Sequence, residues 1–562
     1  MIRPLLLPLA LSLLAGLATA APTPPRLATI AIPGDPRFVR IARDVLLLET
    51  ENQPVFAAQS GLVDDGIGVP SYAPAHVEAM TRRLKADMAA LRALPWRDWS
   101  VDRQIDVRWV YANAETLDHQ LDVERLYLHR PSEWLEPVAN DLIALLTYAP
   151  TRTDAVAGVV ARLPGMVGEM RQICRPTGVD AQVALGVIDG LVAMLRTRAD
   201  RDSAAAIAAL VGYRAEMVAI PDPASFAVIG ADNYAWRLRH ASLLPWDPQA
   251  LLALAQERLK EVDLQIATLA PHLPPAPPLT PEQALQAQAL DQAGLLALYD
   301  QIQVDYRAAI DKAGFVTIPA GVGAVHARVT PDAMVPLTGD GGSMNPPPPF
   351  ADDATGWWNV EHFDPRMPLA EREETLRESL LYLHTSMAPY AAHEGLPGHH
   401  LQLAIARLNP DPLRNLLMDA VQNEGWAVYA EEAMWEQGGL GPSVEAHHFM
   451  LRSWRSRIRR VVYDVNIESG AWTLQQGADW RAASAPGKTA LSPEILRAVN
   501  WPTQLVCYFA GKEQILALKR DAKATWGAAY SERRFHDELL ALGSVPFVFA
   551  RAKLLGEAVP DF

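Results

Sequence analysis

The chain has 562 residues and a formal net charge of −15 at pH 7, and half of its residues are hydrophobic. This acidity argues against a nucleic-acid-binding protein, because such proteins carry a basic surface that meets the phosphate backbone. The length allows two or three ordinary domains or one large helical body. The only cysteines, Cys174 and Cys507, lie in no zinc-finger spacing. An oxidising compartment would permit a bridge between them, but the sequence does not show that they meet.

The N-terminus has the pattern of an export signal. Arg3 provides a positive start, residues 5–17 are apolar, and residues 18–20 are small. The apolar run is too short to span a membrane, and no cysteine follows it that would accept a lipid. We therefore expect residues 1–20 to be a signal peptide and the mature protein to be soluble, without a membrane span, in the periplasm or the medium.

Helical periodicity dominates the rest of the chain, and strand-like runs are few and short, for example at 314–318 and 324–329. This pattern predicts a mainly α protein with one small β-sheet. We expect an N-terminal helical region at 21–270 and a catalytic region at 271–562, packed together as one body. The predicted helices cover 36–58, 74–94, 134–148, 153–173, 179–198, 203–217, 248–269, 281–314, 369–392, 413–436, 443–468 and 493–524. Proline-rich segments at 271–281 and 339–350 are expected to be a helix connection and a long loop, respectively.

The most informative motif is His-Glu-Gly-Leu-Pro-Gly-His-His at residues 393–400. Zinc peptidases place two histidines at i and i+4 of a helix, with a glutamate beside the first as general base. Here Pro397 occupies the i+4 position. In a regular helix His399 would point about 240° away from His393, and His400 would lie about 10 Å along the axis. A break at Pro397-Gly398 would absorb two residues and return His399 to the i+4 place. The alternative is a helix that ends at Pro397 with surface histidines beyond it.

A catalytic zinc site needs a third protein ligand and an open position for water. From His399 a helix would run about 14 Å to Leu408, and the prolines at 410 and 412 would turn the chain. A helix from Leu413 would then return Glu424 to the histidines after about 17 Å. Glu431, two turns later on the same face, would support a ligand by a hydrogen bond. The alternative for these glutamates is a solvated helical face.

At these residues the chain resembles the bacterial family called domain of unknown function 885. The resemblance rests on residues 393–400, on Asn-Glu-Gly-Trp-Ala-Val-Tyr-Ala-Glu at 423–431, on Trp-Trp-Asn-Val at 357–360, on 501–511 and on 535–537. It covers about residues 350–550. The family is similar to the glutamate-zinc peptidases around thimet oligopeptidase and angiotensin-converting enzyme. That similarity implies a helical zincin-like body with an internal active-site cleft, one Zn²⁺ held by His393, His399 and Glu424, and cleavage of peptides. Glu394 would be the general base, and Tyr508 would donate to the oxyanion.

One position departs from the family pattern. Glu468 stands where a histidine is expected, so specificity would change or activity would weaken if that residue contacts the substrate.

The sequence leaves three functions open. The first is an exported zinc peptidase that cleaves oligopeptides. The second is a metal-dependent hydrolase of a small non-peptide amide, because the motif specifies an activated water more firmly than the bond attacked. The third is a binding or scaffold protein that keeps the fold without turnover.

Overall fold

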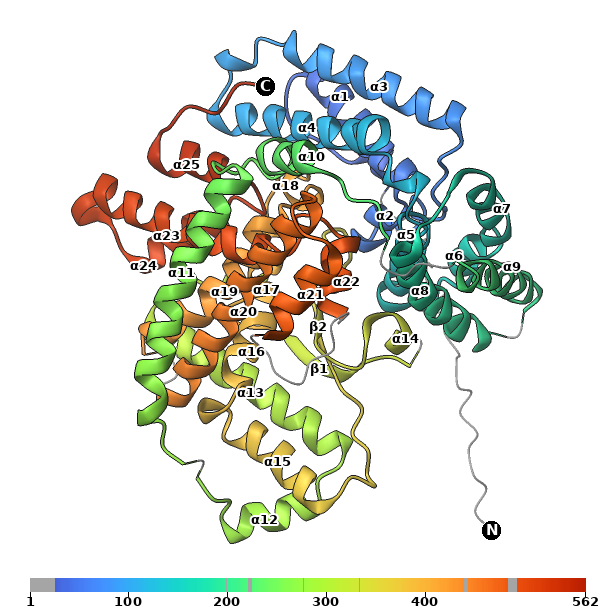
Figure 1. Ribbon diagram of the computed structural model, residues 1–562. Coiled ribbons are helices and arrows are strands. Elements are labelled where there is room, and N and C mark those ends of the chain that lie inside the picture. The colour runs from blue at the N-terminus through green and yellow to red at the C-terminus, as the bar shows by residue number, and fades with distance from the viewer. Residues whose placement is uncertain are drawn as a thin grey trace, which may run out of the picture.

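The computed structural model describes residues 26–198, 200–220, 225–275, 277–332, 334–438, 443–483 and 493–562. The predicted signal peptide lies outside these residues. As predicted, the described part is mainly helical with one small sheet (Figure 1). The N-terminal helices are α1 (Pro36–Asn52), α2 (Val55–Gln59), α3 (Pro74–Arg92), α4 (Val101–His119), α5 (Ser132–Tyr148), α6 (Thr153–Val160), α7 (Leu163–Ile173), α8 (Gly178–Arg196), α9 (Arg201–Val218), α10 (Ala231–Trp236) and α11 (Pro248–Leu269).

The second half adds three strands and the remaining helices. They are α12 (Pro281–Gln288), α13 (Gln292–Ala313), β1 (Val325–Val329), α14 (Val335–Thr338), β2 (Ser343–Asn345), β3 (Gly356–Val360), α15 (Leu369–Leu380), α16 (Met387–Glu394), α17 (His399–Ala406), α18 (Leu413–Leu416), α19 (Ala420–Glu436), α20 (Val444–Glu468), α21 (Leu474–Ala483), α22 (Pro493–Asn500), α23 (Cys507–Trp526), α24 (Glu532–Leu540) and α25 (Phe547–Leu555).

Many helices begin where the sequence supplies a capping side chain. An aspartate, serine or threonine oxygen accepts a hydrogen bond from a first-turn amide and so satisfies a donor that the helix leaves open. Such caps are Asp35, Ser100, Asp200, Asp247, Thr280, Asp291, Asp419, Ser443 and Ser531.

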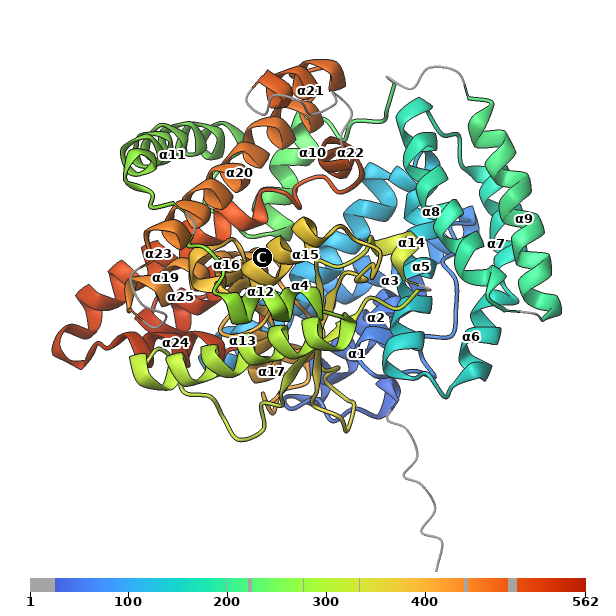
Figure 2. The same cartoon turned by 90° about the horizontal axis from the view of Figure 1, so that it is seen from below.

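One large hydrophobic cluster runs from Leu27 to Val559 and so includes residues of both halves. Figures 1 and 2 show α6–α9 on the outside, with α2 and α5 between them and the helices α16–α23. Among the described helices, only α8 is long and apolar enough to cross a membrane, and most of it is buried inside the protein. Helix α8 packs on α5 and α9, so its apolar residues are part of the core.

The sheet has the strand order β1-β3-β2, with β1 parallel and β2 antiparallel to β3. The buried side chain of Asn359 ties the strands together. Its amide nitrogen donates to Ser343 Oγ (3.0 Å) and Asn345 Oδ1 (2.6 Å), and its oxygen accepts from Arg328 Nε (2.7 Å).

Several predicted elements differ from the observed ones. The strand predicted at 324–329 is confirmed, but that at 314–318 is wrong, because the amide of Thr317 donates to Asp537 Oδ1 (2.7 Å) and not to a neighbouring strand. The loop predicted at 339–350 contains β2. The helix predicted from 413 breaks between α18 and α19, where Asp419 caps a new helix. Cys174 and Cys507 are both free and buried.

Candidate metal centre

The predicted interruption between the two histidines is present. Helix α16 ends at Glu394 and α17 begins at His399, so residues 395–398 form a break. The imidazole rings of His393 and His399 converge, with centroids 4.7 Å apart and planes at 83°. Gly398 permits this fold because a Cβ there would lie 2.1 Å from the carbonyl oxygen of His393, closer than any side chain tolerates.

Two buried side chains brace the break. The Gln303 amide oxygen accepts from the Leu396 nitrogen (3.0 Å), and its amide nitrogen donates to the Ala391 carbonyl (3.2 Å). Trp426 donates its indole N–H to the Pro397 carbonyl (2.9 Å). These bonds satisfy backbone groups that the interrupted helix leaves open, so the break is a fixed element of the fold.

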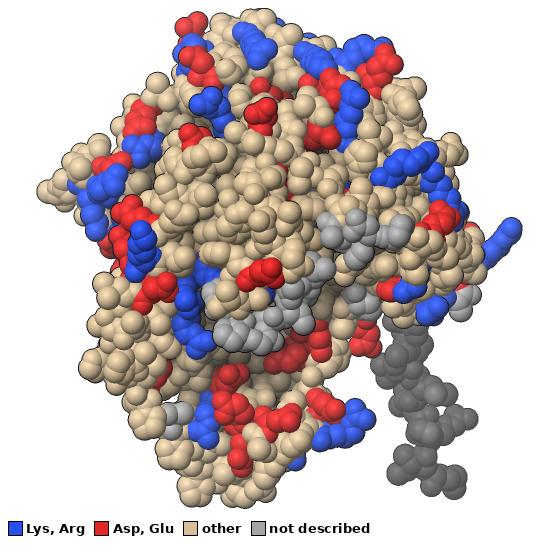
Figure 3. Space-filling view, viewed as in Figure 1, with Lys and Arg blue, Asp and Glu red and all other residues tan. Residues whose placement is uncertain are grey.

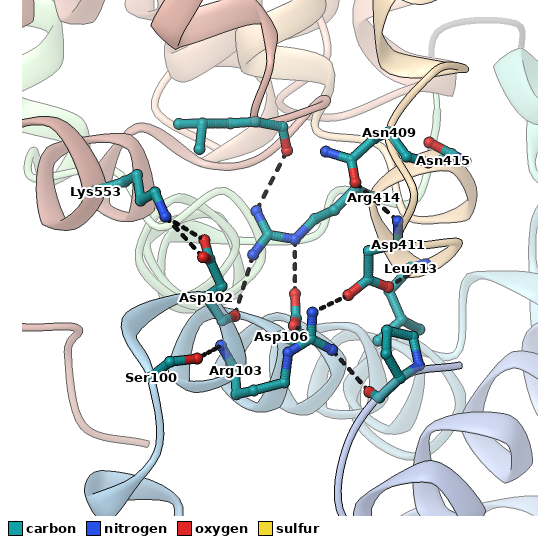
Figure 4. Close-up of polar contacts among 12 residues, drawn as sticks. Ser100, Asp102, Arg103, Asp106, Asn409, Asp411, Leu413, Arg414, Asn415 and Lys553 are labelled. Carbon is teal, nitrogen blue, oxygen red and sulfur yellow. Dashed lines mark hydrogen bonds and ion pairs between the residues drawn. The ribbon is translucent and has the colours of Figure 1, made fainter. Parts of the chain in front are cut away.

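Glu424 reaches the histidines through the turn after α17. Figure 4 shows this turn tied to α4: Arg414 donates to Asp106 (2.7 Å), and Arg103 pairs with Asp411. The Asn415 amide closes the turn on the Asn409 carbonyl (3.1 Å).

Ligand atoms of His393, His399 and Glu424 all lie within 4.8 Å of one another. His399 Nε2 lies 3.5 Å from Glu424 Oε2. A tetrahedral zinc with ligands at about 2.1 Å separates its donor atoms by about 3.4 Å, so this pair already has the required spacing. Glu431 Oε1 lies 2.7 Å from Nδ1 of His393, which leaves Nε2 of that ring for a metal. The residues therefore form a suitable donor set for zinc.

The close contact between these side chains shifts the pKa values of Glu424 and His399. Burial favours a higher pKa for Glu424, but the contact with His399 and the charge of His393 outweigh it and hold the pKa at about 2. Burial favours a lower pKa for His399, but Glu424, Glu394 and Glu431 raise it above its usual value.

The two predicted catalytic residues border the triad. Glu394 is the last residue of α16 and is only partly buried, and its charge acts on both His399 and Tyr390. The Tyr508 hydroxyl accepts a hydrogen bond from Arg497 (3.0 Å). Burial and the charge of Glu424 raise the pKa of Tyr508, so its hydroxyl keeps a proton to donate.

A glycine contact brings Tyr508 and Glu424 near each other. Helices α19 and α23 cross at Gly425 and Gly511, where a Cβ on Gly425 would lie 2.4 Å from Gly511 Cα. Glu424 precedes the first glycine, and Tyr508 lies one turn before the second.

Arginines that the sequence analysis did not single out surround Tyr508. Arg457, Arg460 and Arg497 lie 4.9–5.9 Å from its ring centroid. Residues 457, 460, 464 and 468 repeat every three or four positions, so one face of α20 carries a charged stripe. This charged stripe lies on a helix that also carries the buried Val461, Val462 and Val465. Charged residues among buried ones were the signal from which these arginines could have been predicted as part of the site.

His400, the histidine directly after His399, has a structural role. His400 is fully buried against the sheet, and its Nε2 lies 3.0 Å from the Gly323 carbonyl. Burial lowers the pKa of His400 to about 4, so the ring is neutral.

Glu468 belongs to a buried network whose described partners include no residue of the triad. Its Oε2 accepts from the Ile229 amide (3.3 Å) and lies 3.6 Å from Arg130. Burial raises the pKa of Glu468 to about 7.

Two separate cavities lie between N-terminal helices and segments of the second half that are close in sequence to the triad. One of about 350 Å³ is lined by Leu403 and Met418, and one of about 310 Å³ by Ala420. Leu403 is one turn after His399, and Ala420 one turn before Glu424. Helix α5 lines both cavities, from Glu133 to Tyr148, a distance of about 22 Å at 1.5 Å per residue.

The fold is shared with solved bacterial structures. A candidate lipoprotein of unknown function from Shewanella oneidensis has a TM-score of 0.69 and 18% identity, with 92% of this chain and 99% of that chain covered. A candidate lipoprotein from Colwellia psychrerythraea has a TM-score of 0.67 and 15% identity, with the same coverage of both chains. No curated protein matches the chain. The family model for bacterial proteins of unknown function (DUF885) matches residues 54–554, and the chain therefore belongs to this family.

Proposed function

We propose that this protein is a zinc-dependent peptidase that cleaves oligopeptides. The observation that supports the proposal best is the convergence of His393, His399 and Glu424 across the broken helix, with Glu394 beside them. Zinc held there would act as a Lewis acid that polarises the scissile carbonyl and acidifies water.

The chain's own groups would supply the proton transfers. The Glu394 carboxylate takes a proton from the attacking water and passes it to the leaving nitrogen. The Tyr508 hydroxyl, aligned by Arg497, donates a hydrogen bond to the oxyanion. Glu431 fixes the orientation of His393. Two cavities of about 350 and 310 Å³, lined by Leu403 and Ala420 one turn from His399 and Glu424, offer more room than a small amide needs, which favours a peptide substrate.

We also propose that the protein is exported. The pattern of residues 1–20 supports this, and the two structural relatives are described as candidate lipoproteins, a class of exported proteins.

The test compares wild type with Glu394→Gln after loading with zinc. We expect both to hold about one zinc per chain by elemental analysis, while the variant loses turnover of a peptide library by about 100- to 10,000-fold. Chelation should abolish wild-type activity and zinc should restore it. Glu371→Gln on the exposed side of α15 is the matched control. Equal hydrolysis by Glu394→Gln and wild type would exclude this mechanism.

A further inference from the structure

The cavity lined by Ala420 combines features that suit a cationic group. Its walls include Glu133 of α5, the stacked rings of Tyr72 and Tyr127 (centroids 4.5 Å apart), and the partly exposed Trp501. A carboxylate framed by aromatic rings is the usual chemistry for binding an ammonium or guanidinium group.

Glu133 is the group without a partner. Among the described residues, none forms a hydrogen bond or ion pair with its carboxylate. Burial raises the pKa of Glu133, and only the more distant charges of Arg130 and Arg237 oppose this. The Glu133 side chain is only partly exposed, so water solvates its carboxylate incompletely, and a cationic group in the cavity would stabilise it.

The two guanidinium groups whose charges act on Glu133 already have carboxylate partners. Arg237 is held by Glu124 through two hydrogen bonds, one of them 2.7 Å from Nε to Oε1. Arg130 lies 3.6 Å from both Asp180 and Glu468. Among the described residues, Glu124, Glu133 and Arg237 are the charged ones that line the cavity, so the Glu133 carboxylate remains after Arg237 pairs with Glu124.

The cavity also includes residues that are close to Tyr508 in the chain. Gln504 and Cys507 line it and closely precede Tyr508 on the same segment. Thr503, another wall residue, has φ = 71°, a conformation that β-branched residues rarely adopt and that is often found at binding sites.

We propose that this cavity is a substrate subsite that binds a positively charged group of the peptide through Glu133. The inference rests on the proposed peptidase function for its biological meaning, but the binding of a cation does not require turnover. The net charge of −15, and the Asp and Glu side chains that gather over the lobe of α12 and α15 in Figure 3, would also attract cationic peptides.

Binding is measured first, with zinc-loaded Glu394→Gln protein so that peptides stay intact. Calorimetric titration compares eight-residue peptides that carry lysine, arginine or norleucine at each position in turn, with free or acetylated N-termini. We expect at least one cationic peptide to bind about tenfold or more tightly than its norleucine counterpart. Adding Glu133→Gln should remove most of this difference. Adding Glu216→Gln, which removes one negative charge from the surface of α9, should leave it unchanged.

The peptide series distinguishes a cationic side chain from a free amino terminus as the group that the cavity binds. A preference that follows the lysine or arginine position assigns the cavity to a side chain, whereas one that disappears on acetylation assigns it to the peptide's amino terminus. Equal affinity for cationic and norleucine peptides, or a preference unchanged by Glu133→Gln in a variant that melts like its parent, overturns the subsite. Turnover is then measured in protein with native Glu394, as the cation:norleucine ratio of kcat/KM. Absence of any hydrolysis there would refute the peptidase function while the binding result still decides the subsite.

Discussion

At the scale of single residues, Glu431 illustrates how a buried group can act through a ligand. Its carboxylate accepts from Nδ1 of His393 (2.7 Å) and so fixes which nitrogen faces the metal site. Arg457 lies 3.5 Å from the same carboxylate oxygen.

We therefore expect Glu431→Gln to weaken zinc binding by about 10- to 100-fold, the usual effect of removing a carboxylate behind a histidine ligand. Competition with a chromophoric chelator measures the affinity. Glu436→Gln, at the exposed end of the same helix, should bind zinc like the wild type. An unchanged affinity in Glu431→Gln would show that His393 does not depend on this contact.

At the scale of elements, the crossing of α19 and α23 sets the relation of Glu424 to Tyr508. Both helices have glycine at the contact, and neither backbone can move away without disturbing the helix it belongs to. We expect Gly425→Ala to destabilise the protein by about 1–3 kcal/mol through overpacking and to reduce activity more than zinc content.

Thermal unfolding and elemental analysis measure the two effects. Gly186→Ala is the matched control, because Gly186 lies in the middle of α8 with nothing within 4 Å of an added Cβ. There the better helix propensity of alanine should stabilise the protein by up to about 1 kcal/mol. Similar melting of Gly425→Ala and wild type would show that the crossing tolerates a wider spacing.

The elements also show what the sequence could predict. Capping residues and periodicity locate most helices, and the spacing of residues 393, 399 and 424 correctly predicts which side chains meet. The sequence could not predict that Gln303 holds the broken helix in place or that Glu133 lines the cavity next to Ala420. Each comes from an element distant in the chain, and its position depends on packing that no local pattern encodes. Strand β3 was not among the predicted strands for a different reason. Most of its five residues are buried, so the sequence lacks the apolar and polar alternation that marks a strand.

At the scale of the whole molecule, the fold buries several carboxyl groups without salt-bridge partners strong enough to keep them charged. Burial raises the pKa of Glu49 to about 7, and those of Asp141 and Asp464 to about 8. A carboxyl group whose pKa is higher in the folded state takes up protons on folding. Its contribution to stability is complete below the unfolded pKa, near 4, and is lost as the pH rises through 7 to 8.

Asp141 gives the cleanest test, because neither of its oxygens has a hydrogen-bond partner among the described residues and burial is the one cause of its shift. Between about pH 5 and 8 the unfolded chain is ionised at this residue while the folded protein holds the proton, so each pH unit costs up to about 1.4 kcal/mol of stability. Asparagine has nearly the same shape and no proton to lose. We therefore expect Asp141→Asn to melt close to wild type at pH 5 and several degrees higher at pH 8. Asp352→Asn, on an exposed loop, should follow the wild type at both pH values. If the melting difference between Asp141→Asn and wild type were the same at pH 5 and pH 8, Asp141 would not hold its proton in the folded protein.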